Sequence, residues 1–451
     1  MNRRDFVKAG AAGLALSAFS GYAAELADEK KRVGLIGTGW YGKCDLFRLI
    51  QVAPVEVVSL CDVDKKMVAD AAEMVASRQV SKKKPRTYGD YRQMLKEKDL
   101  DIVLVETPDH WHALAMIEAV KSGADVWVQK PTSVDVVESQ AMLAAARKYK
   151  RVVQVNTQRR SAAFVAEARD KYLRTGRLGA IPLVETYGYL SSRSNEPMPE
   201  AAVPAYLDYE MWTGPAPLLP FRSAIESRVW RSFIEYGNGQ IGDLGIHMFD
   251  VARFMMGLGW PRAISAVGGI YVDKNSPANT SDTQRAEFDY PGTKVSWESR
   301  TWGLPPMPVR HWTDMWGVRF LGEKGTLNVT ALGYEFKPKG SGAPEGSHLL
   351  AVDGDYTKLD QNRLGAAMGS LQNPHVLDFL QAREKRTRPV ADIEEGHIST
   401  ACCILANVAQ ELGRPISYDP KTRSVPGDAE ATRRLAREYR KPWTHPDPQS
   451  V

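Results

Sequence analysis

Residues 31–42 read Lys-Arg-Val-Gly-Leu-Ile-Gly-Thr-Gly-Trp-Tyr-Gly. The first seven predict a short buried strand, and the glycines that follow have the spacing G-x-G-x-x-G. In this motif the glycines permit a tight turn, a close approach of the backbone to a diphosphate and close packing of the next helix. The free N–H groups at the start of that helix also favour a phosphate. We therefore expect the following residues to contact a dinucleotide: Gly37, Gly39, Trp40, Tyr41 and Gly42.

An acidic residue follows the second strand of the same unit. A helical stretch after the turn leads to the apolar run 55–60 and then to Asp62, about twenty residues beyond Gly42. A carboxylate at this place accepts hydrogen bonds from the ribose hydroxyls, and it would repel a 2′-phosphate. The spacing therefore favours NAD over NADP as the cofactor, with Asp62 at its ribose.

Further strands and helices alternate along the chain. We predict strands at 102–105, 126–128 and 152–155 and helices at 110–121 and 134–149. This alternation indicates a parallel, doubly wound α/β sheet, in which ligands bind beyond the carboxyl ends of the strands. Segments with chemically active side chains leave those ends at 107–112, 129–131 and 156–160.

The pattern changes after residue 158. Longer strand-like runs, joined by turns such as Pro291-Gly292, predict a second α/β domain with an open, mostly antiparallel sheet. Its strands are expected at 182–190, 263–272, 283–290, 294–302, 317–321 and 326–330, and a helix at 244–256. We expect an NAD-binding Rossmann domain over 31–158, a substrate and oligomerisation domain over 159–420, and a tail over 421–451 that packs on the surface.

Composition narrows the class of protein. Of the 451 residues, 43% are hydrophobic and 25% are charged, which is typical of soluble globular chains. Lys and Arg number 59 against 54 Asp and Glu, and this net charge of +5 forms no concentrated basic stripe, so we expect no nucleic-acid partner. The cysteines lack the CxxC spacing of zinc or redox sites, and we predict no metal. They are Cys44, Cys61, Cys402 and Cys403.

The first thirty residues have the features of an export signal. Arg3-Arg4 is followed by Phe6 and by the small, apolar run 9–18, as in twin-arginine signals. This run is too short for a stable membrane span in the mature protein. We therefore expect residues 1–30 to direct the protein to the periplasm or otherwise out of the cytoplasm. Twin-arginine export moves folded proteins, which suits a protein that acquires its cofactor before export.

The sequence resembles the Gfo/Idh/MocA oxidoreductases over about residues 32–445. Four segments carry the resemblance in the expected order, namely 37–42, 107–112, 129–131 and 239–247. The resemblance implies a Rossmann domain followed by an α/β domain whose open sheet forms oligomer contacts, so we expect a homo-oligomer. It also implies cofactor contacts by Thr107, Pro108, His112, Gln129 and Lys130.

One of these segments departs from the family pattern. The family's usual Glu-Lys-Pro reads Gln129-Lys130-Pro131 here. Gln keeps hydrogen-bonding capacity but removes a negative charge beside Lys130. The lysine itself is retained, and the resemblance implies that it hydrogen-bonds the reacting hydroxyl or carbonyl and eases proton transfer.

Asp243 and His247 are four residues apart, so a helix would place them on one face. Histidine suits general acid–base catalysis because its ordinary pKa lies near neutral pH, and Asp243 would position the substrate or tune the base. The same spacing could hold zinc, or reflect a helix cap and a core histidine, but no third metal ligand lies nearby in the sequence. We predict catalysis by Lys130, Asp243 and His247.

Substrate contacts are expected from the chain after the last Rossmann strand and from aromatic rings, since sugars stack their C–H faces on such rings. The candidates are Arg159, Tyr206, Trp230 and Tyr236. An arginine at this place could instead form an internal salt bridge, and most aromatic rings in proteins belong to the core.

Two enzymatic functions and one non-enzymatic function fit these features. The first is an NAD-dependent oxidoreductase that moves a hydride between a tightly held nicotinamide and a hydroxyl or carbonyl of a sugar, glycoside or cyclitol. The second is a redox-neutral, NAD-dependent enzyme that cleaves glycosides or processes 3-keto-glycosides. The third is a cofactor-bound sugar-binding protein without catalysis. The intact pair Asp243 and His247 favours the first.

Overall fold

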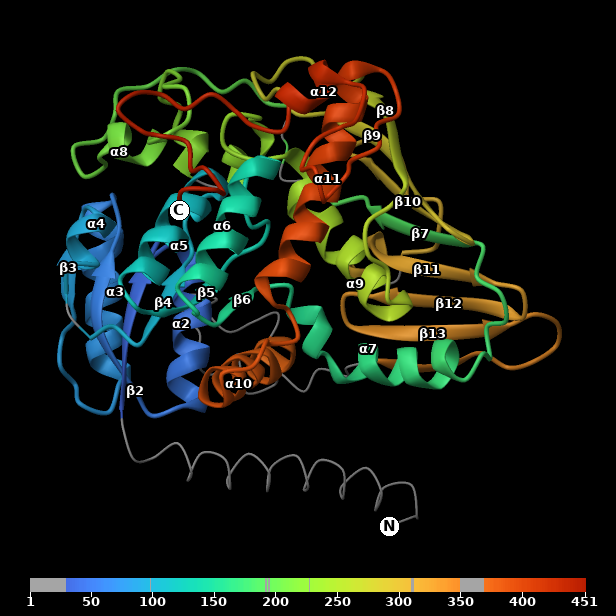
Figure 1. The fold of residues 1–451 in the computed structure, drawn as a ribbon, viewed down its shortest axis with the longest axis horizontal. Coiled ribbons are helices and arrows are strands. Elements are labelled where there is room, and N and C mark those ends of the chain that lie inside the picture. The colour runs from blue at the N-terminus through green and yellow to red at the C-terminus, as the bar shows by residue number, and fades with distance from the viewer. Residues whose placement is uncertain are drawn as a thin grey trace, which may run out of the picture.

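The computed structural model describes residues 30–97, 99–190, 193, 195–226, 228–309, 312–348 and 369–451. The predicted export signal, residues 1–30, lies outside this part of the chain except for Lys30. Within the described ranges no helix is both long and apolar enough to cross a bilayer. The chain forms two layered units side by side, one around each of two β-sheets (Figure 1).

The N-terminal unit is built on a six-stranded sheet with the order β3-β2-β1-β4-β5-β6, in which every neighbouring pair is parallel. Its strands are β1 (Lys31–Ile36), β2 (Val55–Cys61), β3 (Arg86–Tyr88), β4 (Ile102–Val105), β5 (Asp125–Val128) and β6 (Val153–Val155). Its helices are α2 (Trp40–Val52), α3 (Lys65–Arg78), α4 (Tyr91–Met94), α5 (His112–Lys121) and α6 (Val136–Lys148). Every residue of β4, β5 and β6 is buried, because helices cover both faces of the sheet. The predicted doubly wound Rossmann sheet is confirmed.

A separate hydrophobic cluster fills each face of this sheet. Met116 of α5 and Met142 of α6 belong to one cluster, and Leu46 of α2 and Val75 of α3 belong to the other. The second cluster also contains Phe379 of α10 (Gly369–Lys385), which packs against α2. Helix α10 comes late in the chain, within the stretch predicted as the second domain, yet it completes the core of the Rossmann unit.

The C-terminal unit is built on an eight-stranded sheet with the order β14-β13-β12-β11-β7-β10-β9-β8. Its strands are β7 (Leu183–Gly188), β8 (Ala263–Gly269), β9 (Thr283–Tyr290), β10 (Thr293–Arg300), β11 (Trp316–Gly322), β12 (Gly325–Thr330), β13 (Gly333–Pro338) and β14 (Glu345–His348). Neighbouring strands are antiparallel except β7 and β10, which run parallel. The sheet is therefore mixed and mostly antiparallel, as predicted.

Helices cover one face of this sheet and leave part of the other face exposed. The short helix α7 (Ala163–Ala168) lies beside β13, and α9 (Ile246–Met256) and α11 (Ile393–Leu412) lie on the covered face (Figure 1). Side chains of β9 alternate between the two faces, so Ala286 and Phe288 are buried while Arg285 and Glu287 are exposed.

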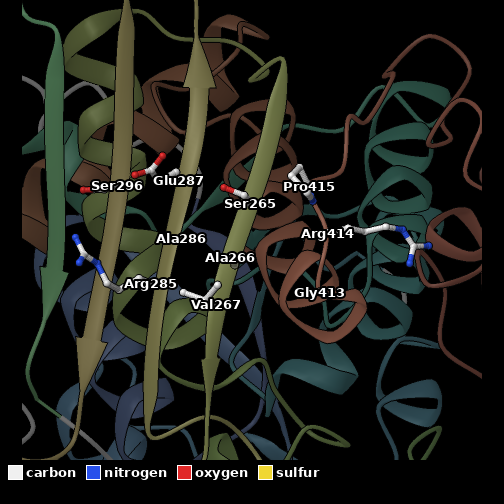
Figure 2. A pocket seen from close by; sticks show the side chains of 10 residues that line it. All are labelled: Ser265, Ala266, Val267, Arg285, Ala286, Glu287, Ser296, Gly413, Arg414 and Pro415. Atoms are coloured by element: carbon white, nitrogen blue, oxygen red, sulfur yellow. The ribbon is translucent and has the colours of Figure 1, made fainter.

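A shallow pocket lies on the exposed face of β8, β9 and β10, beside the chain that leaves α11 (Figure 2). Ser265, Val267, Arg285 and Glu287 line it together with Arg414, and none of its lining residues belongs to the predicted active site. The predicted homo-oligomer through the open sheet concerns this face and stays a prediction.

The end of the chain returns to the Rossmann unit after the short helix α12 (Ala429–Arg433). The Trp443 ring meets the edge of Trp111 with 4.8 Å between ring centroids. His445 Nε2 lies 2.8 Å from Asp135 Oδ2, and Asp135 caps the start of α6. Asp135, Glu138 and His445 are close enough to share a cation, and here they fasten the tail to α6.

Candidate active site

The glycine turn has the close contacts that a diphosphate site requires. Gly37 has a φ of +93°, and a Cβ on it would lie 2.5 Å from the carbonyl oxygen of Glu106. A Cβ on Gly42 would lie 2.1 Å from the carbonyl oxygen of Gly37. A Cβ on Gly39 would meet nothing nearer than Met67 Sδ at 3.8 Å. Gly37 and Gly42 are therefore needed for the turn itself, whereas Gly39 leaves its backbone open to a ligand, so the residues present fit a dinucleotide.

Asp62 follows β2 and braces this turn. Its carboxylate accepts hydrogen bonds from Thr38 N at 2.6 Å, Thr38 Oγ1 at 3.0 Å and Asp64 N at 3.0 Å. Burial raises the pKa of Asp62, and these donors oppose the rise. The carboxylate is thus fixed beside the glycine turn, where the ribose of a bound dinucleotide would lie.

The two aromatic residues of the turn point to different surroundings. Trp40 is 40% exposed, and the guanidinium of Arg228 from the second unit lies 4.6 Å from its ring centroid. The Tyr41 hydroxyl instead accepts hydrogen bonds from the side-chain amides of Gln158, at 3.4 Å, and Gln372, at 3.2 Å. Tyr41 therefore ties the glycine turn to the segment after β6 and to α10, and Trp40 is the ring available to a ligand.

Gln129 serves a buried network within the Rossmann unit. Its amide donates to Asp45 Oδ2 at 2.7 Å, and burial raises the pKa of Asp45 to about 7. Burial and the Asp45 charge raise the pKa of the neighbouring Glu106 well above its ordinary value. A glutamate at position 129 would bring a third carboxyl group to this pair, whereas Gln129 brings an uncharged hydrogen-bond donor. The same network includes Trp127, Asn156 and Gln372, which also donate to Asp45.

His112, predicted to contact the cofactor, links two of the motifs through its ring. Its Nδ1 lies 2.7 Å from the carbonyl oxygen of Pro131, and its Nε2 lies 2.9 Å from the carbonyl oxygen of Thr107. Thr107 and Pro108 come directly after Glu106 at the end of β4, beside the glycine turn. His112 thereby holds the segment after β4 against the segment after β5.

Lys130 and Asp243 meet across the two units. Lys130 Nζ donates to Asp243 Oδ1 at 2.7 Å and to its backbone carbonyl oxygen at 2.8 Å. The Nε of Arg231 lies 3.2 Å from the same Oδ1. Although burial opposes it, the charges of Lys130 and Arg231 lower the pKa of Asp243 to about 2, so this side chain is an anion at neutral pH.

His247 lies one turn beyond Asp243. A π-helical turn, Ile241–Gly245, carries Asp243 and runs directly into α9, which carries His247. The imidazole is buried, and its Nδ1 has no hydrogen-bond partner in the described part of the chain. Burial, then the charges of Lys130 and Arg159, lower the pKa of His247 well below its ordinary value. At neutral pH the ring is therefore an uncharged base beside the ion pair.

Two ionisable residues near this pair escaped the sequence prediction. Asp109 begins a short turn after β4, and burial raises its pKa to about 8, against the opposing charges of Arg231 and Lys130. The position of Asp109 within segment 107–112 could have indicated it. Arg231 lies in a long segment without a recognisable motif, so no sequence signal indicated it.

The four predicted substrate residues lie in three different places. Tyr206 is half-buried near the ribose side, with Lys66 Nζ 3.9 Å from its ring centroid. Trp230 is 8% exposed, and Tyr236 is fully buried in the same hydrophobic cluster, so its ring packs inside the protein. Arg159 is buried with its guanidinium 4.1 Å from the ring centroid of Trp316. The structure shows no internal salt bridge for Arg159 among the described residues.

Comparison with curated proteins finds short matches. The chain is 36% identical over 132 residues to a glycosyl hydrolase family 109 protein of Stenotrophomonas maltophilia, covering 28% of this chain and 29% of that protein. It is 33% identical over 112 residues to an alpha-N-acetylgalactosaminidase of Shewanella oneidensis, covering 24% of each chain. The matches thus span about a quarter to a third of the length of these relatives.

Solved structures match over most of the chain. The aldose-aldose oxidoreductase of Caulobacter crescentus, complexed with glycerol, has a TM-score of 0.63 at 18% identity, covering 86% of this chain and 100% of that one. A levoglucosan dehydrogenase in complex with NADH and levoglucosan has a TM-score of 0.65 at 18% identity, covering 86% and 99%. These structures share the two-unit fold.

Models of protein families identify both units. Residues 31–157 match the model described as oxidoreductase family, NAD-binding Rossmann fold, which confirms NAD as the predicted cofactor of this unit. Residues 188–286 and 359–445 match the model described as oxidoreductase family, C-terminal alpha/beta domain. Both models are of one family, and together they cover more than half of the chain. The chain therefore belongs to the Gfo/Idh/MocA oxidoreductase family.

Proposed function

We propose that this protein is an NAD-dependent enzyme that moves a hydride between a tightly held nicotinamide and a hydroxyl or carbonyl group of a sugar, glycoside or cyclitol. The observation that carries the proposal is the ion pair between the two units, in which Lys130 Nζ lies 2.7 Å from Asp243 Oδ1. The uncharged base His247 lies one helical turn beyond Asp243. A cation and a base near one oxygen atom are the minimum that alcohol oxidation requires of a protein.

The residues divide the proton chemistry between them. NAD, when bound, supplies a ring carbon that accepts or returns the hydride. In the oxidative direction His247 accepts the proton of the substrate hydroxyl, and Lys130 donates a hydrogen bond that stabilises the negative charge developing on that oxygen. Asp243 holds the Lys130 ammonium in place through two hydrogen bonds. In the reverse direction the same groups protonate the carbonyl oxygen.

Tight retention of the cofactor is supported by residues 204–208, which we call the crossing segment. Lys65 N donates to the carbonyl oxygen of Tyr206 at 2.9 Å, and Asp208 N donates to the carbonyl oxygen of Val63 at 3.0 Å. These bonds attach the second unit to the turn after β2, directly beside the ribose-binding position at Asp62. Dissociation of NAD would have to separate these contacts.

A carbohydrate substrate is supported by the names of the similar proteins, which include a levoglucosan dehydrogenase and an aldose-aldose oxidoreductase. The glycosyl hydrolase family 109 relatives support a second candidate, redox-neutral cleavage of a glycoside. In that reaction, oxidation of a sugar hydroxyl acidifies a neighbouring C–H, the glycosidic bond breaks by elimination, water adds, and the hydride returns. Asp109, with its pKa raised to about 8, is a proton donor at neutral pH that could protonate the leaving group.

One experiment separates these candidates. The purified protein is denatured and the released nucleotide is identified by mass, and the intact protein is then offered sugars, cyclitols and nitrophenyl glycosides. Oxidoreductase activity predicts a reduced-nicotinamide absorbance band with one of the sugars or cyclitols. Glycoside cleavage predicts release of nitrophenol without net reduction. Absence of any nucleotide would contradict both candidates. A Lys130→Met variant that keeps all measurable function would favour a sugar-binding protein without catalysis.

We also propose export through the twin-arginine route, supported by Arg3-Arg4 and the apolar run 9–18. Export would make a retained cofactor necessary, because little free NAD is available outside the cytoplasm. Replacing Arg3 and Arg4 by Lys is expected to leave the protein in the cytoplasm, as cell fractionation would show. Equal export of the variant would contradict the proposal.

A further inference from the structure

Arg159 is a buried cation that no carboxylate balances within the part of the chain that the structure describes. It is 1% exposed, and its Nε, Nη1 and Nη2 have no hydrogen-bond partner among the described residues. Burying an unpaired charge in this way is costly to a folded protein, so its retention indicates a purpose beyond packing. Burial lowers the pKa of Arg159 to about 10, and the group remains charged at neutral pH.

Trp316 connects this cation to the catalytic segment. The guanidinium of Arg159 lies 4.1 Å from the Trp316 ring centroid, and the ring of His247 meets the same indole edge-on, with 5.3 Å between centroids. Trp316 Nε1 donates to the carbonyl oxygen of Leu244 at 3.0 Å, within the turn that also carries Asp243. The indole of Trp316 therefore contacts Arg159, His247 and the π-helical turn that carries Asp243.

The other charges around α9 are compensated. Lys130, on the side of the reacting groups, is paired with Asp243. On another side of the helix, Arg160 and Arg253 are joined to Asp250 and Glu395. Lys130 and Arg159 both act on His247, and of these two cations Arg159 is the one without a carboxylate partner among the described residues.

We propose that Arg159, stacked on Trp316, is a positioning residue that orients His247 through the shared indole and favours release of the proton that His247 accepts in the reaction. The proposal rests on the proposed function, in which His247 takes the proton of the substrate hydroxyl. In that step the O–H bond breaks and an N–H bond forms on His247, while the C–H bond breaks as the hydride passes to NAD. The repulsion from Arg159 then favours onward release of the proton from the imidazolium.

The sign of the effect is fixed by Coulomb's law. A cation near an imidazole disfavours the imidazolium, so removing it must raise the proton affinity of His247. Arg159→Met keeps the stem that packs on Trp316 and removes the charge. We expect the His247 titration, and the acid limb of the rate–pH profile, to move up by about one pH unit, the effect of one nearby charge.

The test follows the imidazole directly, without depending on turnover. The full-length holoprotein is labelled at its histidine rings, and the His247 resonance is assigned by its absence in His247→Asn. Titrations of the wild type and of Arg159→Met are compared, with melting temperature and bound nucleotide measured for each. Arg159→Gln is a second neutral variant in case Arg159→Met folds poorly. Arg319→Met is the matched control. Arg319 lies on the same strand as Trp316, β11, and its guanidinium also stacks on an aromatic ring, that of Tyr187.

Three outcomes decide the proposal. An upward shift in both neutral variants, absent in Arg319→Met, supports it. An unchanged His247 titration in variants that retain their fold and nucleotide overturns it and leaves Arg159 a packing residue. If His247→Asn keeps full turnover, the role of His247 in the proposed function fails, while the titration still reports whether Arg159 acts on the ring.

Discussion

Asp243 forms ion pairs with two cations from distant parts of the chain. These are Lys130, which follows β5, and Arg231, which precedes the π-helical turn. Lys130 could be predicted because a resemblance marks it within a short motif. Arg231 could not, because an arginine in a long irregular segment looks like any solvated side chain. For Gln129, the sequence shows that a glutamine stands in this motif. It does not show the hydrogen bond from Gln129 to Asp45, because the fold brings these two residues together.

The first prediction concerns Lys130. Lys130→Met is expected to slow hydride transfer by about 10²- to 10⁴-fold, the range for losing a group that stabilises charge on the reacting oxygen. Single-turnover absorbance of the bound nicotinamide measures this step. Lys121→Met, at the exposed end of α5, is the control. A rate within twofold of the wild type would contradict the proposed role of Lys130.

The second prediction concerns the pH dependence of stability at Asp109. Burial raises its pKa to about 8, so the folded state holds a proton that the unfolded state releases near pH 4. Between these values the folded state binds more protons, and its stability must fall as the pH rises. Asp109→Asn removes this dependence.

We therefore expect Asp109→Asn to gain stability relative to the wild type by up to about 1.4 kcal/mol per pH unit between pH 4 and pH 8. Denaturant unfolding at pH 5 and pH 8 measures the difference, with the surface variant Glu118→Gln as the control. A difference that is the same at both pH values would show that Asp109 is already ionised in the folded protein.

At the scale of elements, the Rossmann strands could be predicted because they are buried on both faces and therefore uniformly apolar. The first strands of the second sheet could be predicted from alternation, but the parallel pairing of β7 with β10 could not, because it joins strands far apart in sequence. Helix α10 was not predicted. Its apolar residues are scattered, Pro374 interrupts its pattern, and contacts with α2 and with the turn after β6 explain its burial.

The third prediction separates the roles of two glycines in one turn. In Gly42→Ala the new Cβ would lie 2.1 Å from a backbone carbonyl oxygen, so the turn must shift, and we expect a loss of about 1–3 kcal/mol in the free energy of unfolding. In Gly39→Ala the nearest atom is 3.8 Å away, so stability should be unchanged.

We propose that the diphosphate approaches the backbone at Gly39, so Gly39→Ala is expected to weaken NAD binding by about tenfold or more, the equivalent of roughly 1.4 kcal/mol of lost contact. Melting temperature and titration of the nucleotide-free protein with NADH measure the two effects. Unchanged NADH affinity in Gly39→Ala would place the diphosphate elsewhere.

At the scale of the whole molecule, the site exists only because distant segments converge. The Rossmann unit contributes the glycine turn and Lys130, and the second unit contributes Asp243, His247 and Trp316. Sequence motifs identified the glycine turn, Lys130, Asp243 and His247, because the residues of each motif have a characteristic spacing along the chain. They could not show that the crossing segment lies against the turn after β2, since its contacts are backbone hydrogen bonds that any sequence can form.

The fourth prediction follows from that convergence. The crossing segment and Arg228 contact the Rossmann unit at two places beside the cofactor position, at the ribose side through Tyr206 and at the glycine turn through Trp40. The double variant Tyr206→Ala/Arg228→Ala removes both side-chain contacts while leaving Gly39 and Asp62 intact. Because these contacts join the two units beside the cofactor position, we expect the dissociation of NAD to become about tenfold faster or more in this variant. We expect little change in melting temperature, since each contact is a cation over a partly exposed ring and contributes about 1 kcal/mol or less.

Stopped-flow loss of the fluorescence of bound NADH, after mixing with excess NAD, measures the dissociation rate. Tyr271→Ala/Arg262→Ala is the matched control, because it removes an exposed tyrosine and an exposed arginine from the second unit, away from the glycine turn. A dissociation rate within twofold of the wild type in both double variants would mean that the two units do not hold the cofactor between them. Retention would then depend on the Rossmann unit alone, and an isolated fragment of that unit, if it folds, should hold NAD as tightly as the full chain.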